Sequence, residues 1–456
     1  MIKDATDSLH DLIVRSVEVL HEPAGEKYRS IEDIQRNRDE FVKDFHTGLF
    51  LLHVMTTQLI IDLEDKMRSP GSLSQVEAKT SKKGWTRVRQ IFRCINDSIV
   101  WSVLQPEPAF LIRRMCREQE RGNLRDQNPE SVMKAMEHYF AGGEALPIWN
   151  DATRCLDISD ITVFSRGGVS FLELKTGKVN ERILEMMAKT DTAEILADLD
   201  VFSKQYGEKG MKQIERIVRQ DDRAGKLLNL VRHDDVFDPF LNAQRVALTP
   251  NEPLKEYDQE MAALLDALRS KDFVEHSVDG CLHILALNLH RDIGLEKGRE
   301  LIRQHLKEKV CRIESEEVDC SDVVLSLDSS FYYPTAMPIM LRRWAGDDIA
   351  RVSLGHIQVY FLFDVNAWAK HLRKSNLVWS TIGEGRKELS KPAKQRLLTV
   401  QGRIPQIVGP KGGQILLGTR FLQAMLCEGI RPMSLAEFYD QMSDFETNFE
   451  SAAQPL

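Results

Sequence analysis

Near the middle of the chain, an aspartate, a glutamate and a lysine occur in one short stretch. It reads Asp160-Ile-Thr-Val-Phe-Ser-Arg-Gly-Gly-Val-Ser-Phe-Leu-Glu-Leu-Lys175. Two carboxylates beside an ammonium group could bind a hard divalent cation, because such cations prefer oxygen ligands. Whether the three side chains meet depends on the local structure of the residues between them.

The stretch between these charged residues predicts a β-hairpin. Residues 161–165 are apolar and rich in β-branched side chains, as expected of a strand. The turn falls on Arg166-Gly167-Gly168, because glycine tolerates positive φ angles. Residues 169–175 then form the return strand.

The position of the turn decides which carboxylates face each other. Asp160 and Glu173 lie equally far from a centre near 166.5, so an antiparallel ladder places them opposite each other on one face. Lys175 lies two residues beyond Glu173 and shares that face. Asp157 is a competing carboxylate, but the same centre pairs it near Thr176, outside the cluster.

A Glu-x-Lys triplet alone carries little information, because the chain contains three. Glu64-Asp65-Lys66 lies near the end of a predicted helix, and Glu77-Ala78-Lys79 lies in a polar segment predicted to be a loop. Only Glu173-Leu174-Lys175 ends an apolar strand with an aspartate across a glycine turn. A surface salt-bridge cluster stays the alternative interpretation of this hairpin.

The arrangement resembles the PD-(D/E)XK nuclease superfamily. In that family a helix precedes a three-stranded meander, the second strand supplies an aspartate, and the third carries Glu-x-Lys. Here residues 131–140 would be the helix, and the run Glu173-Leu-Lys-Thr-Gly-Lys178 is typical of the third strand and its turn. The resemblance covers roughly residues 130–290, and Ser159 stands where the family has proline.

The resemblance implies metal-dependent hydrolysis of phosphodiester bonds. Asp160 and Glu173, with the Leu174 carbonyl, would hold Mg²⁺ or Mn²⁺, and Lys175 would orient the attacking water or stabilise developing charge. Mg²⁺ suits such a site because it binds through few carboxylates and keeps several waters.

The resemblance also implies contributions from the flanking helices. Family members often add a glutamate from the first helix, where Glu137 lies, with Glu144 just beyond it. They also often add a glutamine or lysine from the helix after the meander, where Lys212 and Gln213 lie. Gln213 would help to place the metal or the phosphate. These residue types also populate ordinary helix surfaces, so a solvated role stays open for all of them.

Three clusters of basic residues could contact a phosphate backbone, although solvated surfaces explain them equally well. The clusters are Lys82, Lys83, Arg87, Arg89 and Arg93; Arg113, Arg114, Arg117, Arg121 and Arg125; and Arg386, Lys387, Lys391, Lys394, Arg396 and Arg403. Other motifs are weaker. Cys311 and Cys320 lack zinc spacing, His283 and His290 fit structural positions, and Gly409–Gln414 reads as a turn between strands.

The hydrophobic pattern predicts a mixed α/β protein in three parts, and the resemblance implies a restriction-endonuclease-like core for the middle part. The three parts are a helical domain at 1–128, a nuclease-like domain at 129–300, and a C-terminal α/β domain of unknown role at 301–456. Helices are expected near 41–68, 86–104, 109–121, 130–140, 180–200, 208–220, 254–270, 301–310 and 422–426, and strands near 146–149, 155–175, 244–249, 281–289, 323–327, 356–363 and 414–417.

Composition is that of an ordinary globular protein, with 42% hydrophobic and 29% charged residues among 456. The net charge of −8 argues against a protein covered in basic residues but permits a local basic groove. Seven scattered cysteines indicate reduced thiols, and the polar start lacks a signal-peptide pattern. We therefore expect a cytoplasmic protein that does not span a membrane.

Together these observations predict a metal-dependent endonuclease that acts on DNA, similar to prokaryotic restriction and anti-phage defence nucleases. Two alternatives stay open. One is an RNA-directed nuclease, and the other is a non-catalytic protein that binds nucleic acid or acts as a scaffold. A homo-oligomer or a defence-system partner protein would be compatible with either outcome.

Overall fold

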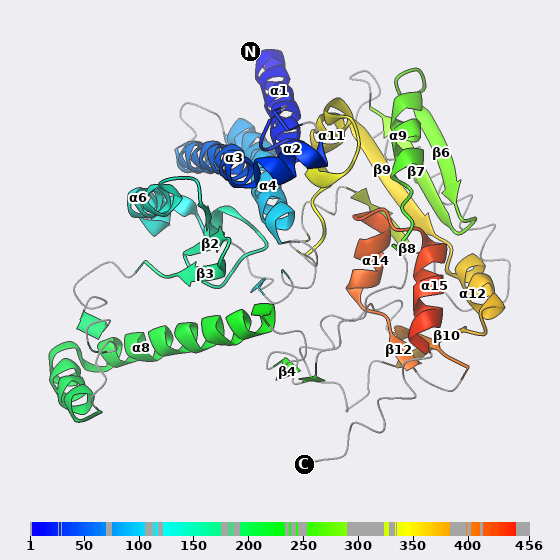
Figure 1. The fold of residues 1–456 in the computed structure, drawn as a ribbon. Helices are drawn as coiled ribbons and strands as arrows, with labels where there is room; N and C mark the ends of the chain where they lie inside the picture. The colour runs from blue at the N-terminus through cyan, green and yellow to red at the C-terminus, as the bar shows by residue number, and fades with distance from the viewer. Residues whose placement is uncertain are drawn as a thin grey trace. The chain divides into compact units, whose positions relative to one another are not determined.

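The structure is a computed structural model of the chain (Figure 1). It describes residues 2–25, 27–28, 30–69, 75–104, 112, 115–116, 122–174, 182–183, 186, 192–232, 237–238, 243–244, 253–289, 323–327, 333, 335–383, 398, 403–410 and 414–443. The chain divides into two compact units. The hairpin unit is Glu22–Arg245, and the terminal unit combines Met1–His21 with Val246–Leu456.

Two long helices form the first half of the hairpin unit and pack against each other. Its helical elements are α2 (Ile31–Arg36), α3 (Arg38–Arg68), α4 (Gln75–Val103), η1 (Leu124–Gln127), α6 (Pro129–Phe140), η2 (Asn150–Ala152) and α8 (Thr192–Arg232). Helix α6 begins with Pro129 in its first turn, where proline loses no hydrogen bond.

The sheet of the hairpin unit is a three-stranded antiparallel meander. Its strands are β1 (Ala145–Trp149), β2 (Ile161–Ser165) and β3 (Gly168–Leu172), in the order β1-β2-β3. Strands β4 (Phe237–Asp238) and β5 (Ala243–Gln244) form a separate pair. Helices α3 and α6 both contact β1, and α8 contacts β3. The predicted order of helix and three strands is therefore present.

The terminal unit contains two more antiparallel sheets. One has the order β6-β7-β9-β8 and the other β10-β11-β12. The strands are β6 (Phe273–Val278), β7 (Leu282–Asn288), β8 (Val323–Ser326), β9 (Ile357–Phe363), β10 (Val378–Gly383), β11 (Arg403–Val408) and β12 (Gln414–Leu416). Its helical elements are α1 (Ile2–His21), α9 (Asp258–Ala267), η4 (Ile339–Leu341), α11 (Gly346–Ser353), α12 (Val365–Lys374), α14 (Thr419–Leu426) and α15 (Pro432–Ser443).

The mixed helix-and-sheet class predicted from the sequence is confirmed. Predicted strands at 146–149, 281–289, 323–327 and 356–363 coincide with β1, β7, β8 and β9 within a few residues. The run Gly409–Gln414 does connect two paired strands, since Val408 lies opposite Gln414. The break between the helices predicted at 180–200 and 208–220 corresponds to a kink in α8 at Gly207, whose φ is 58°.

One local prediction was wrong. The segment 72–84 was expected to be a loop, but α4 begins at Gln75. The segment is polar, yet Gln, Glu, Ala and Lys are all strong helix formers, so polarity alone was a poor guide to its structure.

The division into units also differs from the three predicted regions. Strand β7 pairs with β9 across the predicted boundary at residue 300, and α3 packs on β1 across the boundary at residue 128. Both contacts join segments far apart in sequence, which hydrophobic periodicity cannot reveal.

Candidate functional site

The hairpin forms about the centre expected from its turn. Ser165 lies opposite Gly168 and Ile161 opposite Leu172, so every pair is symmetric about 166.5. Gly168 has a φ of 114°, which an L side chain would rarely adopt. It is the first residue of β3 rather than part of the turn, so Arg166-Gly167 make the tight connection.

Strand β2 is the buried centre of the meander. Ile161 and Thr162 are fully buried, and Val163 and Phe164 are nearly so. Strand β3 is only partly covered, as expected of an edge strand. Asp160 therefore adjoins a buried strand, β2, and Glu173 adjoins a more accessible strand, β3.

Asp160 holds the residues on both sides of Glu173. Its backbone N–H donates to the Leu172 carbonyl at 3.1 Å. Its carboxylate oxygen Oδ2 accepts the Leu174 N–H at 2.6 Å. Because Leu172 is also the ladder partner of Ile161, the pairing shifts by one residue here, as at a β-bulge that re-aims a side chain.

The return strand is shorter than expected. Strand β3 ends at Leu172, so Glu173 and Leu174 follow the ladder rather than belong to it, and both are half-buried. Lys175 lies outside the described residues. The shared face of the Asp160 and Glu173 carboxylates thus stays a prediction, while their backbones are held together by the two Asp160 bonds.

The described residues contain no cluster of three or more His, Cys, Asp or Glu side chains with metal-binding geometry. Mg²⁺ does not require one, because one or two carboxylates with several waters are enough. The Leu174 bond occupies one oxygen of the Asp160 carboxylate, and a carboxylate offers about four lone-pair positions. The residues present therefore fit a hydrated cation better than a fully enclosed one.

Two of the additional candidates lie on helices, and Glu144 lies between α6 and β1. Glu137 is exposed on α6, whose buried residues are Val132 and Met136. Glu144 is exposed and lies 3.7 Å from Lys43. Gln213 follows the Gly207 kink of α8 and is half-buried.

The part of α8 that carries Gln213 also has a small apolar core. Ile183, Phe202 and Ile217 form it, with Tyr206, Met211 and Ile214 packed against them. Lys212 forms an exposed ion pair with Glu208 one helical turn away. Asp157, the competing carboxylate that the hairpin register placed outside the cluster, donates its backbone N–H to the Met115 carbonyl.

A polar platform, missed by the sequence reasoning, supports the start of β2. The loop 150–160 joins β1 to β2, and Asn150 at its start bonds to residues at its end. The Asn150 N–H donates to the Asp160 carbonyl at 3.0 Å, and its side-chain Nδ2 donates to the Ser159 carbonyl at 2.9 Å and to Ser159 Oγ at 3.1 Å.

Helix α4 fixes the same loop through a buried ion pair. Asp97 accepts the backbone N–H groups of Arg154 and Cys155 and lies 2.5 Å from Arg154 Nε. Burial lowers the pKa of the Arg154 guanidinium, but the Asp97 charge outweighs this and the net pKa is raised. Arg154 therefore stays charged, and the pair ties the loop to the helix.

His53 of α3 supports β1 at its outer edge. The Trp149 N–H donates to His53 Nε2 at 2.9 Å, so the ring proton lies on Nδ1, which donates to Asn96 Oδ1 at 2.9 Å. Asn96 in turn donates to the Ala152 carbonyl. Complete burial lowers the pKa of His53 to about 4, although the Asn96 bond opposes this. The imidazole is therefore neutral at physiological pH.

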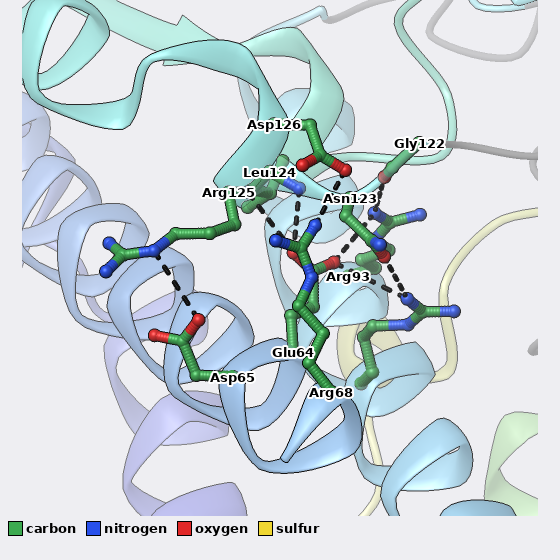
Figure 2. Close-up of polar contacts among 10 residues, drawn as sticks. Glu64, Asp65, Arg68, Arg93, Gly122, Asn123, Leu124, Arg125 and Asp126 are labelled. Atoms are coloured by element: carbon green, nitrogen blue, oxygen red, sulfur yellow. Dashed lines mark hydrogen bonds and ion pairs between the residues drawn. The ribbon is translucent and has the colours of Figure 1, made fainter.

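Part of the first basic cluster has a structural role. Arg93 is 2% exposed, and Figure 2 shows it beside the buried carboxylate of Glu64, 3.8 Å away. Arg89 also pairs with Glu64, at 3.4 Å. Arg93 is too buried to contact a phosphate backbone, so it is corrected from a candidate contact to a structural partner of Glu64. Arg89 is partly exposed, so its contact with a phosphate backbone stays a prediction.

The other basic clusters are described only in part. Arg125 of the second cluster pairs with Asp65 at 3.4 Å (Figure 2), and its other members lie outside the described residues. Of the third cluster only Arg403 is described, and it donates to the Thr381 carbonyl. His283 lies half-buried on β7, while His290, Cys311 and Cys320 fall outside the described residues.

Across the described part of the chain, every helix is too short or too polar to cross a membrane. No protein-family model, curated protein or solved structure matches this chain.

Proposed function

We propose that the protein is a metal-dependent nuclease that hydrolyses phosphodiester bonds, with DNA as the favoured substrate. The observation that carries the proposal is the open end of the β2–β3 hairpin, opposite its turn. There the hairpin register and two Asp160 bonds bring an aspartate against both neighbours of the glutamate in Glu173-Leu174-Lys175. The order of α6 and the three strands of the meander also supports the proposal.

In this proposal the chain's own residues have separate tasks. Asp160 and Glu173, with the Leu174 carbonyl, hold a Mg²⁺ or Mn²⁺ ion. When bound, the ion supplies charge neutralisation at the phosphate and an acidified water. Lys175 orients the attacking water or stabilises charge on the phosphate. Gln213 and, secondarily, Glu137 would help to place metal or substrate.

A role in anti-phage defence belongs to the same proposal. It rests on the resemblance to prokaryotic restriction and defence nucleases, as does the choice of DNA over RNA. A cytoplasmic setting, expected from the scattered cysteines of the sequence, is part of the same proposal.

The test is cleavage of plasmid DNA, linear DNA and RNA by the full chain with Mg²⁺ or Mn²⁺. Wild type is compared with Glu173→Ala and Lys175→Ala, and with Glu130→Ala as a matched exposed glutamate on α6. We expect both site variants to lose cleavage by about 100-fold or more and the control to retain it. EDTA should abolish cleavage, and added Mg²⁺ should restore it.

Two results would overturn the proposal in different ways. Cleavage that persists in both site variants would remove the hairpin from the mechanism. Tight, salt-sensitive binding of nucleic acid by wild type without any cleavage would favour the scaffold alternative. Cleavage of RNA alone would keep the site and change the substrate.

A further inference from the structure

Asn150 is almost completely buried, with 1% of its surface exposed, at the end of β1. A buried amide normally has its polar atoms bonded. Its Nδ2 meets this rule twice, through the Ser159 carbonyl and the Ser159 hydroxyl. Its Oδ1 has no hydrogen-bond partner in the part of the chain that is described, so the donor half of the amide is the part in use.

The bonds that Asn150 makes fix the backbone on which Asp160 sits. The Asn150 side chain holds Ser159, and the Asn150 backbone N–H holds the Asp160 carbonyl. The Ser159 hydroxyl then donates to the Ile161 carbonyl at 2.9 Å. These bonds constrain Asp160 and the residues on both sides of it, independently of the bond from its carboxylate to Leu174.

Asn150 is in turn held from two sides. Its carbonyl accepts the Thr153 N–H at 3.0 Å and the Thr153 hydroxyl at 2.7 Å. On the other side its neighbour Trp149 donates to His53 of α3. Hydrogen bonds and the chain itself therefore link α3, through Trp149 and Asn150, to Asp160, whose carboxylate accepts the Leu174 N–H.

We infer that Asn150 is a positioning residue that fixes the Asp160 carboxylate beside Glu173 for metal binding. The inference rests on the proposed function, because it concerns the same site. Groups that orient a metal ligand without touching the metal commonly contribute 10- to 100-fold to metal affinity. We therefore expect loss of the Asn150 amide to weaken Mn²⁺ binding by about 10-fold or more.

The experiment compares Asn150→Ala with Asn288→Ala in the full chain. Asn288 is a matched control, because it is also buried and donates its amide to one backbone carbonyl, that of Leu268, but lies in the terminal unit. Two quantities are measured: the Mn²⁺ dissociation constant by titration calorimetry, and amide hydrogen exchange over residues 158–174. Asn150→Ala should raise the Mn²⁺ dissociation constant and the rate of amide exchange, and Asn288→Ala should change neither quantity.

Ser159→Ala guards against a variant that fails to fold. It removes one acceptor of Asn150 Nδ2 and the bond to Ile161, while the Ser159 carbonyl remains. Its effects should have the same direction as those of Asn150→Ala and be smaller.

The results separate failure of the inference from failure of the proposed function. Unchanged Mn²⁺ affinity in folded Asn150→Ala and Ser159→Ala, with tight binding by wild type, overturns the inference and leaves the nuclease proposal standing. Absence of both Mn²⁺ binding and cleavage in wild type overturns both. In that case, faster amide hydrogen exchange over residues 158–174 in Asn150→Ala would show that Asn150 stabilises the hairpin but has no role in metal binding.

Discussion

Two Glu-x-Lys triplets of this chain have opposite environments. Glu64, of Glu64-Asp65-Lys66, is 1% exposed at the end of α3. It accepts the Leu124 N–H at 2.7 Å and pairs with Arg93 (Figure 2). It also pairs with Arg89. Glu173, of Glu173-Leu174-Lys175, is half-buried just beyond β3, where Asp160 bonds to its two neighbours.

This difference separates a structural carboxylate from a candidate ligand. The Glu64 carboxylate is surrounded by donors from its own chain, because it joins η1 to two helices. A carboxylate that binds an exchangeable ion must keep contact with solvent, as the partial exposure of Glu173 permits. The same three-letter motif therefore serves stability at one position and, in our proposal, chemistry at the other.

The largest loss of stability should come from the buried pair that supports the hairpin loop. Asp97→Ala removes the carboxylate that bonds to the buried, charged Arg154 guanidinium, and it also removes the acceptor for two backbone N–H groups. We expect the free energy of unfolding to fall by about 4 kcal/mol. Chemical denaturation checks this, with exposed Asp62→Ala on α3 as the control. Equal stability of the two variants would contradict the claim that the Asp97–Arg154 pair stabilises the loop 150–160.

Acid should lower the free energy of unfolding through protonation of His53. The folded protein keeps His53 neutral down to a pKa of about 4, whereas the unfolded chain takes up a proton near pH 6.5. The unfolded state thus binds more protons in this window, so stability falls as pH falls from about 6.5 to 4, by about 3 kcal/mol. Denaturation across this pH range checks the prediction.

A His53→Gln variant isolates that contribution. Burial also lowers the pKa of His46 and His283, so wild type carries further dependence of the same sign. The variant should lose only the share due to His53. An unchanged slope of stability against pH in His53→Gln would contradict the assignment.

Neutralising Glu64 should cost stability without touching the proposed chemistry. Glu64→Gln keeps an acceptor for the Leu124 N–H but removes the negative charge beside the buried Arg93. We expect a loss of about 2 kcal/mol. Cleavage by the folded variant should equal that of wild type, and a specific loss of cleavage would move the active site to α3.

The smallest effect should be at the exposed pair beside Glu64. Arg125 and Asp65 lie 3.4 Å apart with about half of each side chain exposed. Arg125→Ala should therefore change the free energy of unfolding by no more than about 0.5 kcal/mol. A loss comparable to that of Glu64→Gln would show that the charges of Figure 2 act as one cooperative network.

Local features of the sequence predicted the hairpin well, and long-range contacts limited the rest. The register about 166.5 depends on two glycines and a short apolar run, and α6 begins at a proline, so both can be read within a few residues. Asn150 and His53 could not be identified in this way. Each becomes important only when partners far away in sequence, such as Asn96 for His53, bury it and complete its hydrogen bonds.

The ladder shift at Asp160 was also beyond sequence reasoning. Centring the turn predicted simple opposition of Asp160 and Glu173, but the Asp160 N–H bonds to Leu172, and its side chain reaches Leu174. A side chain that competes with backbone groups for one N–H alters the end of a ladder without changing the hydrophobic pattern.

The most direct test of the account measures Glu173→Gln for both cleavage and stability. The substitution keeps the shape of the side chain and removes its charge at a half-buried position outside β3. We predict that Mg²⁺-dependent cleavage of DNA falls by about 100-fold or more, while the free energy of unfolding falls by less than it does in Glu64→Gln. Wild-type cleavage by Glu173→Gln, or a stability loss as large as that of Glu64→Gln, would contradict it.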